Sequence, residues 1–178
     1  MTSDQTIIEA VRHWVEVMVV GLNLCPFAKR ELINERVRFI ETQATSEEAL
    51  LNFLTHELNL LVKDDSIETT LLIHPHVLQD FFDYNQFLDL VDALLKELNV
   101  EGVFQVASFH PDYQFGGTNL NAAENYTNRA PYPLLHIIRE ASLERAIDEY
   151  PDVNQIPERN VALMNEMGVS QLKALLES

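Results

Sequence analysis

Hydrophobic positions recur at spacings of three and four residues over the first part of the chain, which predicts a long amphipathic helix. Its apolar stripe comprises Ile7, Ile8, Val11, Trp14, Val15, Met18, Val19 and Leu22. Gly21 and Asn23 indicate its end, since both residue types are common at helix C-termini. Pro26 is then typical of the first residue of a short second helix.

Downstream, short β-rich runs alternate with longer helical patterns. We expect three strands from this pattern, at residues 37–40, 69–73 and 103–109. Thr45 and Glu48 have the spacing of a capping box and predict the start of the helix that follows the first strand. A fourth strand is expected at 134–138, although a continuous helix over 134–150 fits the same apolar run.

Strands that alternate with helices imply right-handed parallel crossovers. We therefore predict an α/β fold: a layered domain with a mostly parallel central sheet of about four strands, flanked by helices. The length of 178 residues and the apolar content of 47% suit one domain that spans residues 1–178.

Net charge narrows the range of partners. The formal charge of -16 repels duplex nucleic acid and anionic membranes, and there is no uninterrupted basic stripe. No apolar stretch approaches the roughly 18 residues of a membrane span. We expect no nucleic-acid partner and no membrane association, while the oligomeric state stays open.

Cysteine usage points to a reducing compartment. Cys25 is the one cysteine, so no intrachain disulfide forms. Residues 1–5 lack the basic region that opens a signal peptide. We expect a cytoplasmic protein.

Two predicted strands end in the same dipeptide, His74-Pro75 and His110-Pro111. If both strands are parallel, the two imidazoles meet at the carboxyl edge of the sheet, where ligands of open α/β sheets bind. The alternative is that each histidine is a satisfied structural residue at the end of a strand.

A second interpretation of these histidines is a metal centre. His74, His76, His110 and Asp112 are the candidate ligands, and zinc is a suitable ion for imidazole and carboxylate donors. The spacing matches no tight metal-binding motif.

Cys25 precedes Pro26 and is a candidate N-cap of the short helix, where the helix dipole stabilises a thiolate. With His110 as acid/base and His74 as a second polar group, it forms a candidate nucleophile. The alternative is a buried, inert cysteine.

A polar segment over 112–131 is long for a loop in a compact domain, which favours a functional role. Arg129 is a candidate clamp for a small anionic ligand with a carboxylate or phosphate group, or else a residue that holds the loop in place. Tyr126, Asn128 and Asp112 are the other candidate ligand-binding residues. Arg139, in the apolar run after this segment, is expected to need a carboxylate partner if it is buried.

Four stretches of sequence are long enough to be specific: LNLCPFA at 22–28, TLLIHP at 70–75, QVASFHPDYQF at 105–115, and NYTNR at 125–129 with PYP at 131–133. Together they resemble a bacterial family of similar length, the domain of unknown function 1415 family. Ala130 stands where a small polar residue is expected. The resemblance implies a whole-chain domain of bacterial cytosolic type and assigns no catalytic residue.

We therefore expect a small-molecule enzyme or ligand-binding domain with a Cys/His site at the carboxyl edge. The reaction would be acyl or group transfer, or hydrolysis. Two alternatives remain open: a metal-binding domain, and a non-catalytic acidic module that binds other proteins.

Overall fold

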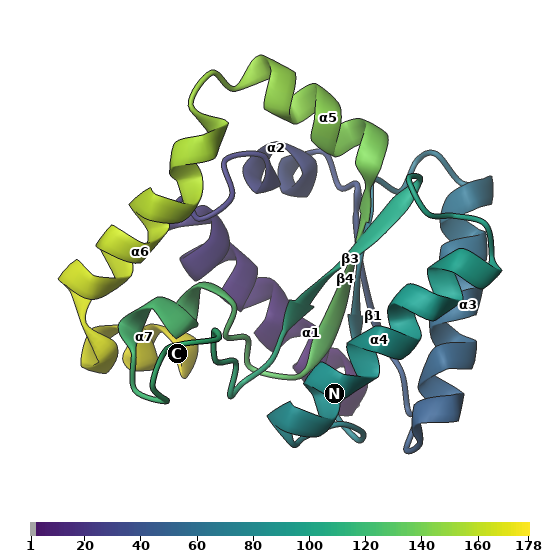
Figure 1. The fold of residues 1–178 in the computed structure, drawn as a ribbon, viewed down its shortest axis with the longest axis horizontal. Helices are drawn as coiled ribbons and strands as arrows, with labels where there is room; N and C mark the ends of the chain where they lie inside the picture. Colours follow the sequence, from purple (N-terminus) through teal and green to yellow (C-terminus); the bar gives the residue numbers. More distant parts are fainter. Residues whose placement is uncertain (1–2) are drawn as a thin grey trace.

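The computed structural model describes residues 3–178 and contains a four-stranded sheet with helices on both faces (Figure 1). The strands are β1 (Val37–Glu41), β2 (Thr69–Ile73), β3 (Phe104–Phe109) and β4 (Leu134–Arg139). The longer helices are α1 (Ser3–Trp14), α3 (Glu47–Lys63), α4 (Phe81–Glu97), α5 (Glu140–Glu149), α6 (Ile156–Met167) and α7 (Val169–Leu176). The shorter ones are η1 (Val15–Val20, a π-helix), α2 (Ala28–Ile33), η2 (Ala123–Thr127) and η3 (Val153–Gln155).

The strand order β1-β2-β4-β3 corrects the prediction of a mostly parallel sheet. β1 and β2 are parallel, but β4 runs antiparallel to both of its neighbours, so two of the three pairings are antiparallel. The alternation of strands and helices holds only as far as β3. Segment 110–133 contains only the short turn η2 and no crossover helix, so the chain re-enters the sheet at the edge where β3 ended.

The inserted strand still leaves the carboxyl ends of β2 and β3 at one edge. Both strands are antiparallel to β4, and Leu134 at the start of β4 is in register with Ile73 on one side and Phe109 on the other. The chain then passes directly from β4 into α5. The expected strand at 134–138 is therefore confirmed, and the continuous helix over 134–150 is wrong.

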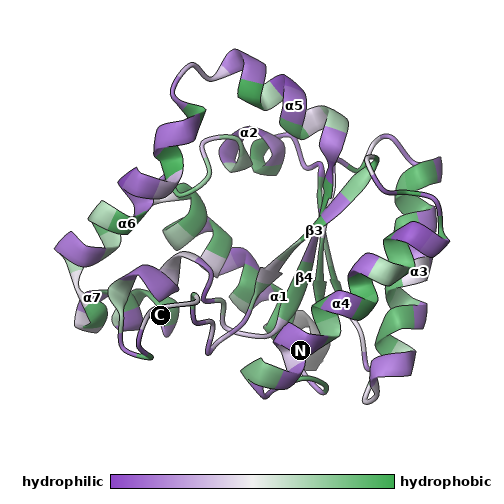
Figure 2. Ribbon diagram, in the orientation of Figure 1, coloured by the Kyte–Doolittle hydropathy of each residue, from purple (hydrophilic) through white to green (hydrophobic). Residues whose placement is uncertain are grey.

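Successive strand residues point to opposite faces, and each face buries its own core. On one face, which we call the α4 face, Leu72 and Leu135 pack against α3 and α4. On the other, the α1 face, Leu71 and Ile73 pack with the apolar stripe of α1 and η1 and with parts of α6 and α7. Figure 1 shows these two groups of helices on either side of the sheet, and Figure 2 shows hydrophobic colour along the central strands.

Side-chain hydrogen bonds cap the starts of α3 and α4. Ser46, one residue after the predicted Thr45, caps α3 by accepting a hydrogen bond from the backbone N–H of Ala49. Asp80 caps α4 in the same way, through the N–H of Phe82.

Within residues 3–178, none of the helices has the length and apolar character that crossing a membrane requires.

Candidate functional site

The carboxyl edge of the sheet brings His74 and His110 into contact with one tyrosine. His74 follows β2, His110 follows β3, and both side chains are fully buried. The ring centroid of Tyr84, from α4, lies 5.7 Å from that of His74 and 5.1 Å from that of His110. We call these three residues the histidine cluster.

Backbone groups form hydrogen bonds with three of the four ring nitrogens of the two histidines. His74 Nδ1 lies 3.0 Å from the carbonyl oxygen of Val77, and His110 Nε2 lies 3.0 Å from that of Leu78. The backbone N–H of Asp112 donates to His110 Nδ1 at 3.0 Å. Leu78 has a φ of 62°, a region that non-glycine residues rarely adopt. The two imidazoles therefore hold the turn after β2 in its conformation.

Burial keeps this cluster uncharged. It lowers the pKa of His74 to about 4, and it also lowers the pKa of His110, so both rings are neutral at pH 7. The Tyr84 hydroxyl donates to the carbonyl of Leu134 and accepts from the N–H of Phe109. Within the histidine cluster, Nε2 of His74 is the one polar side-chain atom that is enclosed without a partner among the described residues.

Cys25 lies apart from this cluster. It is exposed in the turn before α2, whose N-cap is Phe27, so the prediction of an N-cap cysteine is wrong. The exposure also rules out the alternative of a buried cysteine. Its thiol makes no hydrogen bond with His74 or His110 in the described part of the chain. The structure therefore does not assemble the thiol–imidazole pair.

The four candidate metal ligands do not gather either. His76 and Asp112 are exposed, and both ring nitrogens of His110 are engaged by backbone groups. Among residues 3–178, no three His, Cys, Asp or Glu side chains are placed to hold a metal ion.

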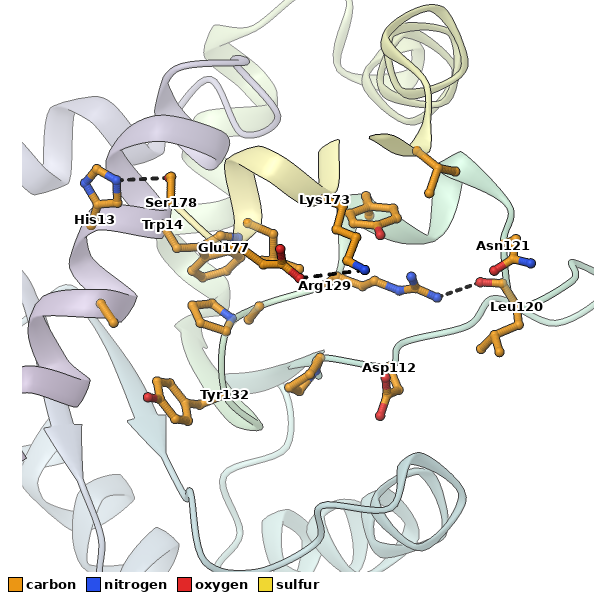
Figure 3. Close-up of a pocket in the computed structure, with 17 residues that line it drawn as sticks. His13, Trp14, Asp112, Leu120, Asn121, Arg129, Tyr132, Lys173, Glu177 and Ser178 are labelled. Atoms are coloured by element: carbon orange, nitrogen blue, oxygen red, sulfur yellow. Dashed lines mark hydrogen bonds and ion pairs between the residues drawn. The ribbon is translucent and has the colours of Figure 1, made fainter. Parts of the chain in front are cut away.

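A cavity of about 730 Å³ opens on the α1 face, between α1, segment 111–132 and α7. We call it the α1–α7 cavity (Figure 3). Three of the four predicted ligand-binding residues, Asp112, Tyr126 and Arg129, line it. Neither Cys25 nor the histidine cluster does.

Asn128, the fourth predicted residue, ties the polar segment to the sheet instead. Its side-chain amide donates to the backbone carbonyl of Ser108 at 3.0 Å, and its backbone carbonyl accepts a hydrogen bond from the N–H of His110. Asn125 is fully buried and joins both ends of the turn before it, with hydrogen bonds to Phe115 and Asn119 among others. The segment is thus held in place by its own polar side chains.

Arg129 is buried, and no carboxylate in the described part of the chain pairs with it. Its Nε donates to the carbonyl of Tyr113 at 3.1 Å and its Nη2 to that of Leu120 at 2.8 Å. The guanidinium also lies over the ring of Tyr126, 4.7 Å from its centroid. Of the five N–H donors of a guanidinium, these bonds use two, and neither hydrogen of Nη1 has a partner among the described residues.

Three side chains of the cavity wall carry donors with no partner in residues 3–178. Trp14 is 3% exposed, Tyr126 5% and Arg129 8%. The indole N–H of Trp14, the hydroxyl of Tyr126 and Nη1 of Arg129 make no hydrogen bond there, yet none of these atoms is fully enclosed. Because all three residues line the cavity, we infer that the uncovered donors face it.

Arg139 shows how a fully engaged arginine differs. Its guanidinium donates to the carbonyls of Leu61, Asp64 and Ile67 at 2.8–3.1 Å, which satisfies the end of α3. Arg139 is only part-buried, so the condition for a carboxylate partner is not met, and backbone carbonyls accept its hydrogen bonds. Arg139 is a structural residue and does not line the α1–α7 cavity.

Sequence reasoning missed Trp14, His13 and Lys173, which also line the cavity. Trp14 belongs to an apolar stripe typical of a core helix, and Lys173 lies in a short C-terminal helix with no motif. No local signal distinguishes them, since α1 and α7 come together only in the folded chain. Asp112 and Glu177 add two carboxylates to the wall, and Lys173 Nζ lies 3.9 Å from Glu177.

The chain belongs to the family described as Protein of unknown function (DUF1415), whose model matches residues 6–174. This confirms the resemblance drawn from the four sequence stretches. No curated protein and no solved structure matches the chain. The family description names no activity, so function has to be argued from the site itself.

Proposed function

We propose that this protein binds a small molecule in the α1–α7 cavity through an anionic group of that molecule. The observation that carries the proposal is the set of free donors on three buried side chains: Trp14, Tyr126 and Arg129. These side chains are mostly buried, but their donor atoms stay open to the cavity, where they can donate to an acceptor on a bound molecule in place of water.

Arg129 supplies the charge. Its guanidinium is oriented by two backbone carbonyls and by the ring of Tyr126, while Nη1 stays available. A preoriented guanidinium binds a carboxylate or phosphate with charge-assisted hydrogen bonds, which are about twice as strong as neutral ones. Partial burial strengthens the attraction further.

This binding does not involve catalysis by Cys25, His74 or His110. Both nitrogens of His110 and Nδ1 of His74 are engaged by the backbone. Cys25 is exposed at a separate place in the chain, so these groups contribute no chemistry to the cavity.

Trp14 provides a direct readout, because it is the one tryptophan in the chain and lines the cavity. We would titrate acetate, cyclohexanecarboxylate and inorganic phosphate and follow its fluorescence. We expect saturable binding of at least one anion, weakened about tenfold or more by Tyr126→Phe, since a hydrogen bond to a charged group is lost. Tyr150→Phe, which removes a hydroxyl outside this cavity, is the matched control and should bind as wild type.

Two arginine variants separate binding from folding. Arg129→Gln should abolish the fluorescence response. Arg139→Gln should keep the response but lower the free energy of unfolding by about 2 kcal/mol, because the buried carbonyls at the end of α3 lose their donor. Binding that survives both Arg129→Gln and Tyr126→Phe, or no response to any of the anions, would contradict the proposal.

A further inference from the structure

We infer that the ligand of the α1–α7 cavity is a monocarboxylate attached to an apolar, ring-sized body. This inference rests on the proposed function and names the class of molecule. Two features of the cavity carry it: the apolar part of its wall and the signs of its charges.

Part of the wall is apolar, and the cavity is larger than a bare anion fills. Trp14, Tyr132 and Leu176 line the cavity together with Pro131 and Val169. A volume of about 730 Å³ lies in the range of pockets that hold small organic molecules. Acetate or inorganic phosphate would leave most of this wall wet. A ring-sized body covers it and gains affinity from the apolar area removed from water.

The charges of the wall favour a single negative charge. Arg129 and Lys173 are its two permanent cations, and Asp112 and Glu177 are carboxylates in the same wall. Lys173 is already shared with Glu177, at 3.9 Å. A second negative charge on the ligand would meet these carboxylates in a chain that carries -16 overall. One carboxylate matches the free edge of Arg129 and meets less of that repulsion than a doubly charged group does.

The test uses three probes with the same ring: cyclohexanecarboxylate, cyclohexyl phosphate and cyclohexanecarboxamide. None of them absorbs where Trp14 is excited, so the fluorescence titration can be used for all three. We expect the carboxylate to bind about tenfold or more tightly than the phosphate ester, and also than acetate, which lacks the body. The neutral amide should bind still more weakly, since it carries no charge for Arg129.

The double variant Asp112→Asn with Glu177→Gln tests the cause of the preference. Removing both carboxylates should narrow the gap between carboxylate and phosphate ester at least several-fold, mainly by improving the phosphate. A phosphate ester that binds wild type as tightly as the carboxylate, or an unchanged gap in the double variant, overturns the monocarboxylate class and leaves the proposed function standing. An amide that binds as tightly as the carboxylate removes the anion from recognition, and the proposed function falls with it.

Discussion

Two groups of polar side chains lie near the same edge of the sheet, on opposite faces. On the α4 face, the histidine cluster is enclosed, and most of its polar atoms are bonded to backbone groups of the chain. On the α1 face, the α1–α7 cavity is lined by Trp14, Tyr126 and Arg129, whose donors have no partner in the described residues.

The two groups differ in whether their polar atoms are bonded within the chain, and residue type alone does not reveal this. Histidine at a strand end suggests a catalytic role, yet here two histidines form hydrogen bonds with the turn after β2 and hold it in place. Tryptophan in an apolar stripe suggests a core, yet Trp14 keeps a free donor beside a cavity. For a buried side chain, the partners of its polar atoms therefore indicate its role better than its residue type does.

The largest effect that we expect is a loss of stability when the histidine cluster is disrupted. Replacing His110→Ala leaves the carbonyl of Leu78 and the N–H of Asp112 unpaired and removes a ring from a packed interior. We expect the free energy of unfolding to fall by about 4 kcal/mol and Tm by about 10 °C. Chemical denaturation and thermal melts measure both quantities.

His76→Ala is the control, because this histidine is exposed and two residues from His74. It should change stability by less than about 0.5 kcal/mol. Equal stability of the His110→Ala variant and wild type would show that the cluster is not a scaffold.

The next effect is a pH dependence of stability. The pKa of His74 falls from an ordinary 6.5 to about 4 in the folded chain, so its contribution is fully present above pH 6.5 and is lost as pH falls towards 4. The loss between pH 7 and pH 4 should be about 3 kcal/mol from this residue. His110 and His136, whose pKa values are also lowered by burial, act in the same direction.

His74→Asn isolates the contribution of His74. The asparagine amide can donate to Val77 from the position of Nδ1, and it does not titrate. Denaturant unfolding at pH 7 and pH 4 should show a smaller loss for this variant than for wild type. Identical losses would mean that protonation of His74 does not set the acid sensitivity.

The smallest effect concerns Cys25, which is exposed and outside the cavity. Cys25→Ser should leave the free energy of unfolding within about 0.5 kcal/mol of wild type and leave anion affinity unchanged. Fluorescence titration and thermal melts check the two expectations. Lost binding with an unchanged Tm would bring the thiol back into the site.

Most elements could be predicted from periodicity, with the buried stripe of α1 and strand β2 as clear examples, whereas the run that forms β4 fitted a strand or a helix. Strand direction could not, since β4 reaches the sheet through a segment without a crossover helix, and no local pattern distinguishes parallel from antiparallel entry. The polar segment drew attention to Asp112, Tyr126 and Arg129, which line the α1–α7 cavity; that they bind a ligand stays a proposal. It misled for Asn128, whose amide fastens the loop to β3.

By itself, the sequence determined the family, most of the helices and strands, and the acidic net charge, because these depend on sequence similarity, on short-range periodicity and on composition. Only the tertiary structure decided which polar groups are satisfied. The convergence of α1, segment 111–132 and α7 on one cavity depends on pairings between residues far apart in the chain. The same is true of the bonds from two strand-end histidines to the carbonyls of Val77 and Leu78, which engage ring nitrogens that were expected to serve in catalysis.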